Sequence, residues 1–457
     1  MTFRHQAVPS ALALLTLLAP ALAQDKADAA LKKELRSKEA AAKKDPEALF
    51  AVAKWAAEKA LTADSKRLYE AVLKAKPDHA GANEALGNVR VEGKWMPKKD
   101  AEALASKAVA AEMLAKGLVE VDSVWVDKAH ADDAKRGVFH HDGELVTRDE
   151  KLALLAGKVR HAETGELFDA KFADKAKAGL FPLAGDSWGD EAQADAYHAD
   201  PAHPWLVRSK HATIVSQLPI TKLRQYRGEV EAAWIRVRNV LGETPPGPQH
   251  RPVLIIAATQ DEYIALGKQV GDESSCTSAF LMRVGAQARL PGLPEIRAGV
   301  CDGTGALGPY MTRHAAGMAY AHAKAREAGV DLPLWLLYGI GSLTSRFMND
   351  GDAAHYARQD LQSGGVTNLK QFFRDFKLSA DLDQAALRHN QFQPGLLLDY
   401  ALQPDADKAV VAARTALTAS LEKPSKGAGA KAIEQLEAAL IAAQEQVAAH
   451  LQKRSRN

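Results

Sequence analysis

Cysteine is nearly absent from this 457-residue chain, which contains only two. Two cysteines are too few for a disulfide-dense scaffold or for a four-cysteine zinc ribbon. Charge of one sign is not in excess either, because 59 Lys and Arg face 57 Asp and Glu. The net charge of +2 excludes a general nucleic-acid binder driven by bulk electrostatics. The hydrophobic share of 47% is too high for a disordered chain and indicates a soluble, globular, multi-domain protein.

Long apolar runs are also lacking beyond the first residues. There, the pair Arg4-His5 precedes the apolar run Ala11–Ala19, Pro20 and a small-x-small site at 21–23. This order is typical of a secretory signal peptide over residues 1–23. A membrane anchor is the alternative, but the run is too short to span about 30 Å of hydrocarbon. We therefore expect a periplasmic or extracellular protein with no transmembrane segment in its mature chain.

Residues 24–88 are rich in Ala, Lys, Glu and Leu, with apolar residues at helical spacing. The positions that match the second helix of a tetratricopeptide repeat and its terminating proline are Tyr69, Val72, Leu73 and Pro77. Leu86-Gly87 falls where the next repeat would carry its Leu-Gly pair, consistent with the 34-residue period. The segment resembles one such unit and a fragment. Because a repeat needs neighbours to bury its face, we expect a small helical domain rather than a peptide-binding superhelix.

Residues 89–200 contain short β-like pieces, each followed by a polar stretch of helical character. The aromatic or Leu residues that head these pieces are Trp95, Trp125, Leu145, Leu167 and Trp188. We predict small hairpin-plus-helix modules, each of which buries its Trp or Leu against its helix. His140-His141 is a tempting metal pair, but adjacent residues on a strand point to opposite faces. A solvated pair is therefore the favoured interpretation.

Residues 201–423 alternate strand-like and helix-like segments, and residues 424–457 are expected to form a flexible break and a C-terminal helix. The expected strands are Trp205–Gln217, Val253–Ala258, Ala279–Val284 and Ile296–Val300, and the expected helices are Ile220–Leu241, Asp261–Gly271, Pro309–Ala328 and Pro333–Phe347. The fold class is α+β. Gly317, inside an expected helix, costs about 1 kcal/mol relative to Ala and so predicts close approach of another backbone.

This order of elements, with the segment Pro333-Leu334-Trp335-Leu336-Leu337-Tyr338-Gly339, resembles the peptidase-MA-like group of the gluzincin metallopeptidases over roughly residues 205–421. Family members carry His-Glu-x-x-His on one helix and Pro-x-Trp-Leu-x-Glu-Gly on a second. The two histidines share a helix face and reach one zinc ion, while the adjacent Glu is the general base. The downstream Glu completes three protein ligands. The resemblance implies a mixed sheet followed by a mostly helical half.

The chemistry of that motif is missing here. His314 stands at the first ligand position, Ala315 at the general-base position, Met318 at the second ligand position and Tyr338 at the downstream Glu position. Ala offers no base, a thioether suits zinc poorly, and a phenol is a weak ligand. We therefore expect a remnant site with no catalytic residue and no zinc, in which His314 is half-buried and hydrogen-bonded. The spacing of the other candidate ligands, His322, Glu327, Asp350, His355 and His389, does not predict a rescued site.

Three functions remain open. The favoured one is a non-catalytic pseudo-metallopeptidase that binds a protein or peptide or serves as a scaffold, with no nucleic-acid partner. The alternatives are a zinc metallopeptidase with a non-standard ligand set and a structural protein of the cell envelope. A bound peptide could pair with an edge strand, which we place near Ile296–Val300. Export also permits a disulfide between Cys276 and Cys301, with two unrelated buried thiols as the alternative.

Overall fold

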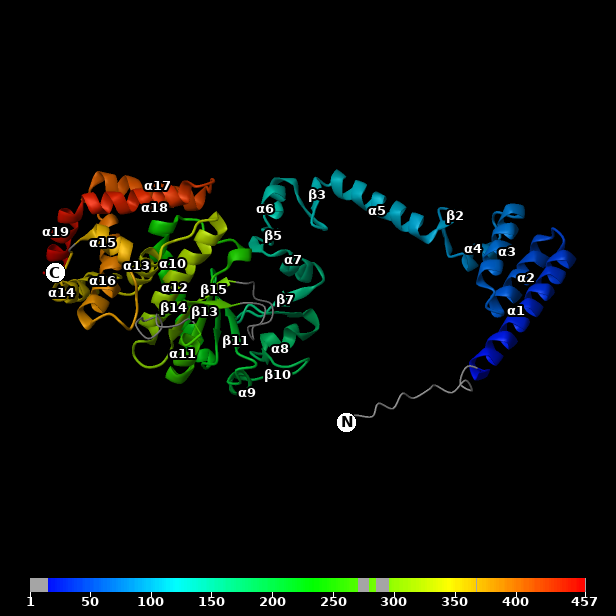
Figure 1. Cartoon of the computed structure of the whole chain (residues 1–457), viewed down its shortest axis with the longest axis horizontal. Coiled ribbons are helices and arrows are strands. Elements are labelled where there is room, and N and C mark those ends of the chain that lie inside the picture. Colours follow the sequence, from blue (N-terminus) through cyan, green and yellow to red (C-terminus); the bar gives the residue numbers. More distant parts are fainter. Residues whose placement is uncertain (1–14, 270–278, 285–295, 367, 457) are drawn as a thin grey trace, which may run out of the picture. The chain divides into compact units, whose positions relative to one another are not determined.

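The computed structural model describes residues 15–269, 279–284, 296–366 and 368–456. It divides into two compact units, Met1–Val119 and Glu120–Asn457, each of which is described by itself (Figure 1). Helices predominate and the sheets are small, with one larger mixed sheet, so the predicted α+β class is confirmed. None of the helices in the described ranges is long and apolar enough to cross a membrane.

The first unit begins with a group of helices. Their bounds are α1 (Leu15–Ala42), α2 (Pro46–Glu58), α3 (Thr62–Ala75) and α4 (Ala80–Ala85). The Asp45 carboxylate accepts a hydrogen bond from the Glu47 backbone N–H and so caps the start of α2. Helices α2 and α3 pack together around Ala53, Leu68 and Val72, which are fully buried. Residues 1–14 lie outside the described ranges, so the signal peptide stays a prediction.

Short antiparallel hairpins follow, each continuing into a helical segment. The strands are β1 (Asn88–Val91), β2 (Lys94–Pro97), β3 (Leu118–Val121), β4 (Val124–Asp127), β5 (Phe139–His141), β6 (Glu144–Val146), β7 (Lys158–Arg160), β8 (Leu167–Asp169), β9 (Phe181–Pro182) and β10 (Trp188–Gly189). The helical segments are α5 (Lys98–Ala115), η1 (Lys128–His130), α6 (Ala131–Lys135), α7 (Arg148–Leu155), η2 (Ala170–Phe172), α8 (Ala173–Lys177) and α9 (Glu191–His198). The turns Glu92-Gly93, Asp122-Ser123 and Asp142-Gly143 have positive φ at both residues, which matches the twist of a hairpin.

The side chains that these hairpins bury differ from those expected. Leu145 is 44% exposed, so the prediction that every module buries its Trp or Leu is wrong. The corresponding residues of the other hairpins are only half-buried, namely Trp95, Trp125, Leu167 and Trp188. The buried residues are their neighbours Val124, Val126, Phe139, Val146, Phe168 and Phe181. Successive side chains on a strand point to opposite faces, so burial of Val146 turns Leu145 to solvent.

A five-stranded mixed sheet forms the centre of the second unit, in the order β11-β12-β13-β15-β14. The strands are β11 (Trp205–Arg208), β12 (Thr213–Ser216), β13 (Val253–Ala257), β14 (Ala279–Val284) and β15 (Ile296–Asp302). The single strand expected over Trp205–Gln217 is a hairpin, because the Ser209 N–H donates to the Ala212 carbonyl and closes a turn. The edge strand expected near Ile296–Val300 is also wrong, since β15 lies between β13 and β14.

Helices cover both faces of this sheet (Figure 1). Helices α10 (Ile220–Leu241) and α12 (Gly308–Ala328) pack on one face, and α11 (Gln260–Gly267) packs on the other. The short η3 (Pro248–His250) precedes β13 and contacts α12. Strand β13 is buried throughout, with Leu254 and Ile256 facing α10 and α12 and with Val253 and Ile255 facing α11. A parallel strand covered on both faces has this continuous apolar sequence.

Helix α13 (Leu334–Leu343) packs against α12 and ends before the expected Phe347. A Cβ atom on Gly317 would lie 2.5 Å from Thr344 Oγ1 and 3.0 Å from the Ile340 carbonyl oxygen. The predicted close approach of another backbone at Gly317 is therefore confirmed. The glycine permits a contact between α12 and α13 that places the candidate site residues of both helices side by side.

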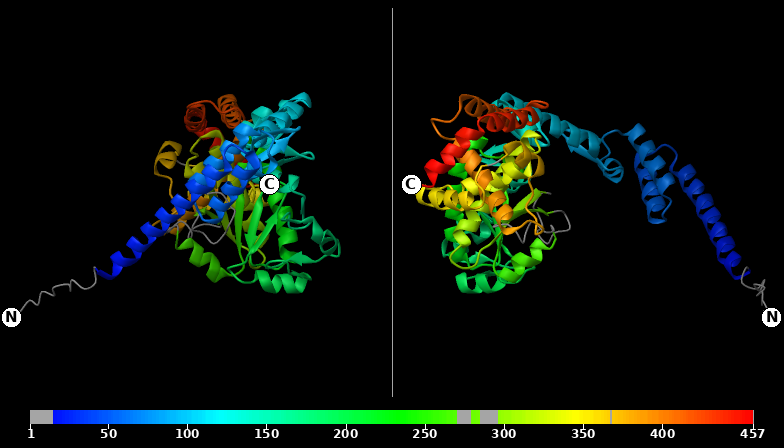
Figure 2. Two further views of the ribbon diagram at one scale, coloured as in Figure 1. Left: turned by 90° about the vertical axis from the view of Figure 1, so that its right-hand side faces the viewer. Right: turned by 60° about the vertical axis from the view of Figure 1, so that its left-hand side comes forward.

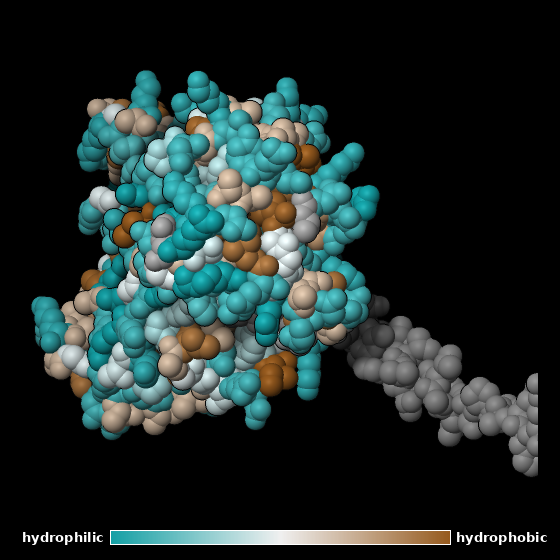
Figure 3. Space-filling model, turned by 90° about the vertical axis from the view of Figure 1, so that its left-hand side faces the viewer, coloured by the Kyte–Doolittle hydropathy of each residue, from teal (hydrophilic) through white to brown (hydrophobic). Residues whose placement is uncertain are grey.

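The rest of the second unit is helical. Its helices are α14 (Asp350–Gln362), α15 (Leu369–Asp375), α16 (Gln384–Ala401), α17 (Lys408–Glu422), α18 (Ala428–Ala442) and α19 (Gln444–Arg454). Figures 1 and 2 show α17 and α18, in orange and red, lying side by side over α10 and α12. The C-terminal helix expected as one piece is divided at Ala443 into α18 and α19. The face near α14, α16 and α19 is mainly hydrophilic, with scattered apolar patches (Figure 3).

Candidate functional site

The four residues of the predicted remnant site lie together in the core between α12 and α13. His314, Ala315 and Met318 are on α12, Tyr338 is on α13, and each is at most 2% exposed. The ring centroids of His314 and Tyr338 are 4.6 Å apart. The structure therefore brings His314 of α12 and Tyr338 of α13 into contact.

His314 is more deeply buried than the sequence suggested, with no exposed surface. Its Nδ1 lies 3.0 Å from Ser345 Oγ, and the Ser345 hydroxyl donates to the Gly341 carbonyl oxygen, also at 3.0 Å. Because that hydroxyl proton is already used, Nδ1 donates and Nε2 keeps its lone pair. Nε2 has no hydrogen-bond partner in the part of the chain that the structure describes. Burial, followed by the charge of Arg346, lowers the pKa of His314 well below 6.5, so the imidazole is neutral.

Arg346, which is not part of the motif, completes this cluster. Its guanidinium donates to the Tyr338 hydroxyl at 3.3 and 3.4 Å, to Ser342 Oγ at 3.1 Å and to the Gln391 carbonyl at 2.7 Å. It also lies over the rings of Tyr338, Tyr356 and Phe392, 5.1 to 5.6 Å from their centroids. Burial opposes its charge, but the neighbouring tyrosines, Tyr338 first, raise the pKa of Arg346 above its usual range. Arg346 is therefore a fixed buried cation.

A signal for Arg346 does exist in the sequence. It is the only charged residue between Leu334 and Met348, within an apolar segment. A lone arginine in such a run is buried only when other groups satisfy it, and here the Gln391 carbonyl of α16 accepts a hydrogen bond and the Tyr356 ring of α14 packs against the guanidinium. The periodicity of one helix does not reveal them.

The donor set does not suit zinc. A catalytic zinc site uses three protein ligands and an open position. The groups at the ligand positions here are an imidazole, a thioether and a phenol that accepts hydrogen bonds from a guanidinium. Gly341 also lies close to the imidazole, since a Cβ there would be 2.7 Å from His314 Nε2. Within the described ranges, no three His, Cys, Asp or Glu side chains are grouped so as to hold a metal ion.

The other candidate ligands belong to separate contacts. His389 Nδ1 is 2.9 Å from Asp360, Asp350 pairs with Arg454 at 2.6 Å, and Glu327 accepts from the Gly247 N–H at 3.2 Å. His355 is an exposed residue of α14, and His322 is on α12. His140 and His141 are also engaged separately, His140 with Asp133 at 2.8 Å and His141 with Lys151 at 3.2 Å.

Cys301 is fully buried on β15, with its Sγ 3.7 Å from Thr312 Oγ1. Burial raises the pKa of the Cys301 thiol to about 12, so this group is a poor nucleophile. Its expected partner Cys276 lies outside the described residues, and the disulfide stays a prediction.

A second feature of the unit is a cavity of about 930 Å³ where the hairpins meet the sheet and α10, which we call the basic cavity. Its cationic lining residues are Arg160, Arg208, Lys210, Arg224, Arg227 and Arg251, and its acidic ones are Glu144 and Glu231. Neither the sequence resemblance nor any local motif pointed to it. Its charges come from β7, the β11–β12 turn, α10 and the segment before β13, which only the tertiary fold brings together.

The turn at 161–165 builds one wall of the basic cavity. His161 is buried, its Nε2 lies 3.1 Å from the Leu180 carbonyl oxygen, and its Nδ1 accepts from the Thr164 N–H. The Thr164 carbonyl in turn accepts from the Arg208 N–H at 2.8 Å. Gly165 has a φ of +72°, and a Cβ there would lie 2.7 Å from Arg208 Cβ. A glycine is thus required for the turn to reach β11.

The charges of the basic cavity are only partly paired. Glu150 binds both Arg208 and Arg160, the second at 3.2 Å, and Arg160 also contacts Glu144 at 3.1 Å. Arg251 donates to the carbonyl oxygens of Ser209 and Lys210 at 3.2 and 3.1 Å, which are neutral acceptors. Burial, reinforced by the charge of Arg208, lowers the pKa of Arg251 to about 10. Arg251 remains charged near neutral pH while its neighbours disfavour the charge.

Three lining cations, Lys210, Arg227 and Arg251, have no carboxylate within 4.0 Å among the described residues, although Glu150 is near enough to favour the charge of Arg251. A carboxylate placed about 4 Å from one such group gains on the order of 4 kcal/mol of Coulomb energy at an effective dielectric constant of about 20, before the cost of its desolvation. The cavity is therefore electrostatically suited to an anionic ligand.

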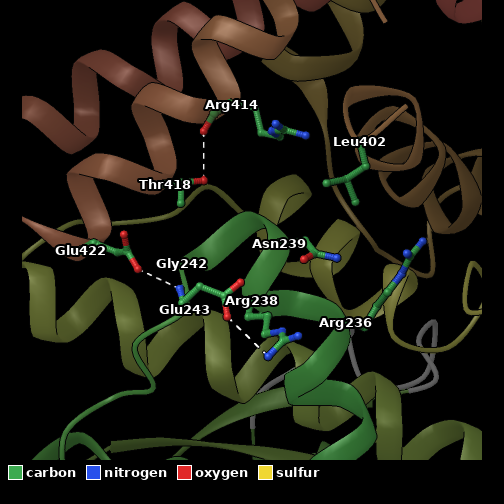
Figure 4. Close-up of a pocket in the computed structure, with 9 residues that line it drawn as sticks. All are labelled: Arg236, Arg238, Asn239, Gly242, Glu243, Leu402, Arg414, Thr418 and Glu422. Atoms are coloured by element: carbon green, nitrogen blue, oxygen red, sulfur yellow. Dashed lines mark hydrogen bonds and ion pairs between the residues drawn. The ribbon is translucent and has the colours of Figure 1, made fainter. Parts of the chain in front are cut away.

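A smaller concavity of about 440 Å³ lies between α10 and α17 (Figure 4). Its charges are largely satisfied within the protein: Arg238 pairs with Glu243 at 3.4 Å, Arg414 donates to the Ala401 carbonyl at 3.0 Å, and Glu422 accepts from the Glu243 N–H at 2.7 Å. These contacts tie the end of α10 to α17, which is a structural role.

Comparison of the chain with family models, with curated proteins and with solved structures finds no significant match. The resemblance to the gluzincin group therefore rests on the motif positions and on the order of elements.

Proposed function

We propose that this protein is an exported, non-catalytic relative of the gluzincin metallopeptidases that binds a protein or peptide. In this proposal a signal peptide precedes a tetratricopeptide-like helical segment, the hairpin-plus-helix modules and a peptidase-MA-like domain. The mixed sheet, α12 and α13 correspond to the sheet and the two motif helices of that family.

The observation that carries the non-catalytic part is the bond between Arg346 and Tyr338. Tyr338 stands at the position of the third zinc ligand, and its hydroxyl accepts from a buried guanidinium whose charge also acts on His314. A fixed cation at this place opposes the binding of a dication. Ala315 and Met318 are packed in the core, so the base and the second ligand are replaced by apolar contacts.

The basic cavity supports the binding part. Ligand sites are concave, typically about 300–1,000 Å³, and contain a few convergent polar groups with perturbed pKa values. The basic cavity has such a size and contains arginines whose pKa values are lowered by burial. The buried guanidinium of Arg251, which is held by neutral carbonyl oxygens, is the feature that favours binding over a purely structural role.

The zinc content of the mature chain, residues 24–457, tests the first part. The protein is purified without chelator and without a histidine tag, and zinc is measured by elemental analysis beside His314→Ala and the control His355→Ala, which changes an exposed histidine. We expect less than about a tenth of an equivalent of zinc in all three proteins. An equivalent of zinc that is lost in His314→Ala and kept in His355→Ala would establish the alternative of a metallopeptidase with non-standard ligands.

Binding of peptides tests the second part. The mature chain is applied to an array of peptides of varied charge and hydropathy, and bound protein is quantified. We expect a reproducible subset of peptides to bind. If no peptide retains the protein, the binding function is rejected and the structural alternative is favoured.

A further inference from the structure

We infer that the basic cavity binds an acidic peptide segment, a stretch of chain with several Asp or Glu side chains separated by small or apolar residues. The inference rests on the proposed binding function and adds to it the place of binding and the chemistry of the ligand. It uses no part of the remnant site between α12 and α13.

The balance of charge within the cavity is the first argument. Six Lys and Arg side chains line it against two Glu side chains. Glu150, just behind the lining, is shared between Arg160 and Arg208, so one carboxylate serves two guanidinium groups. Arg224 is paired with Glu163 and Glu191. Among the described residues, the unpaired positive charge of the cavity therefore lies on Lys210, Arg227 and Arg251, although the whole chain carries a net charge of only +2.

The state of the individual cations is the second argument. Arg251 is held in place by two backbone carbonyls, and Arg227 donates to the Glu163 carbonyl at 2.7 Å. These bonds orient the guanidinium groups without neutralising them. Lys210 is exposed on the β11–β12 turn at the rim. A guanidinium group that the fold already holds in place binds a carboxylate at a lower entropic cost, because its side chain need not be ordered on binding.

The spread of the charges favours a peptide over a compact anion. A single phosphate or sulfate is bound where several donors converge on one point. Here Arg160, Arg208 and Arg251 lie near Glu150, whereas Lys210 is on the β11–β12 turn and Arg227 is on α10, so the cations are distributed over a cavity of about 930 Å³. A ligand with several separated carboxylates matches this distribution.

The uncharged lining points the same way. Pro245, Pro246 and Pro248 form one part of the wall, and Leu145, 44% exposed, lies at another. These groups suit the apolar side chains that separate acidic residues in a peptide. Among the described residues, the lining contains no Phe, Tyr or Trp on which nucleic-acid bases would stack. The cavity therefore favours an acidic peptide over a single-stranded nucleic acid.

Fluorescence anisotropy tests the proposal on the full mature chain. The probe is a labelled peptide that alternates Glu with Leu and Ala, and its matched control has Gln in place of every Glu. We expect the Glu peptide to bind at least about tenfold more tightly than the Gln peptide, and to weaken several-fold between about 0.05 M and about 0.2 M salt.

Charge-neutralising variants locate the site. Lys210→Gln changes an exposed side chain and leaves the fold intact, while Arg227→Gln and Arg251→Gln remove oriented cations. We expect about a threefold loss of affinity for Lys210→Gln and about a tenfold loss for each arginine variant. Arg374→Gln, an exposed arginine of α15, is the matched control and should bind as the wild type does. Circular dichroism confirms that each variant is folded.

Several outcomes would overturn the inference. Equal binding of the Glu and Gln peptides would remove the role of charge, and unchanged affinity in Lys210→Gln and Arg227→Gln would place the ligand elsewhere. Displacement of the peptide by inorganic phosphate or by oligothymidylate at an equal concentration of negative charge would assign the cavity to phosphate ligands. Binding of neutral peptides alone would reject this site and ligand while leaving the proposed binding function in place.

Discussion

Replacing Gly317 with Ala measures how closely α12 and α13 approach each other. Alanine improves helix propensity by about 1 kcal/mol. However, its Cβ would lie 2.5 Å from Thr344 Oγ1 and 3.0 Å from the Ile340 carbonyl oxygen. The Thr344 hydroxyl lies 2.7 Å from the carbonyl oxygens of both Arg313 and Gly341 and donates its proton to them. Rotation of the Thr344 side chain away from the new Cβ would break these hydrogen bonds. Overpacking costs about 1–3 kcal/mol. When the weakened hydrogen bond of Thr344 is added and the gain in helix propensity is subtracted, we expect the free energy of unfolding to fall by about 1–3 kcal/mol.

The same substitution at Gly228 is the matched control. Gly228 lies inside α10, and a Cβ there would meet no atom within 4 Å. Gly228→Ala should therefore stabilise the protein by about 0.5–1 kcal/mol. Thermal unfolding of the mature chain, followed by circular dichroism, should give a Tm lowered by roughly 2–6 °C for Gly317→Ala and a slightly raised Tm for Gly228→Ala. If both variants raised Tm, the close contact of the helices, and with it the geometry of the remnant site, would be refuted.

Three further variants test the contacts around the core. His314 resists protonation in the folded protein but accepts a proton in the unfolded chain below a pKa of about 6.5, so the free energy of unfolding should fall as the pH drops below that value. Urea unfolding at about pH 7 and about pH 5 measures this fall, and His314→Gln should lose ~2 kcal/mol less than the wild type. An equal loss in both proteins would contradict a buried neutral imidazole. Tyr338→Phe removes an acceptor of the Arg346 guanidinium and should cost about 1–3 kcal/mol, whereas an unchanged urea midpoint would show that this bond is not formed. Asp399→Ala removes the buried carboxylate that binds Arg454 and His450 of α19, and it should lower the free energy of unfolding by about 3 kcal/mol. It should also make α19 sensitive to limited proteolysis. Resistance equal to that of the wild type would argue that these bonds do not hold α19 in place.

Elements with strong local signals are the ones that the sequence predicted well. The bounds of α10 agree with the expected helix because a long amphipathic pattern ends at Gly242, whose φ is +97°. Strand β14 also has the expected bounds, Ala279–Val284. Gly317 was correctly interpreted as a close contact, since an unfavourable residue inside a helix requires a packing reason.

Features that depend on tertiary context were not predictable in this way. The position of β15 inside the sheet depends on which side β14 adds, and the apolar pattern of either strand is compatible with both orders. Leu145 was expected to be buried because it is large and apolar, but the pleat of β6 assigns the buried face to Val146. In both cases the local sequence predicts the strand, whereas the packing of neighbouring elements determines its place in the sheet and which of its side chains are buried.

The candidate sites show the same division. His314, Ala315, Met318 and Tyr338 were found from a motif that places them on two adjacent helices, and the structure brings them together. Arg346 was missed because its partners come from other segments. The basic cavity was missed entirely, since its cations are distributed from residue 160 to residue 251 and cancel against acids elsewhere in the composition.

The contacts between α12 and α13 hold these two helices together through the groups of the protein itself. Gly317 and Gly341 allow the two helices to approach, and the hydroxyl of Thr344 bonds across from α13 to the Arg313 carbonyl of α12. Positive charge is supplied at the same place by Arg346, whose guanidinium is anchored by hydrogen bonds and aromatic rings. A group anchored in this way can be removed only at the cost of the bonds that hold it. The variant Met318→His with Tyr338→Glu, which changes the two ligand positions of the motif, should therefore not bind zinc, because Arg346 would remain and would pair with the new carboxylate at position 338.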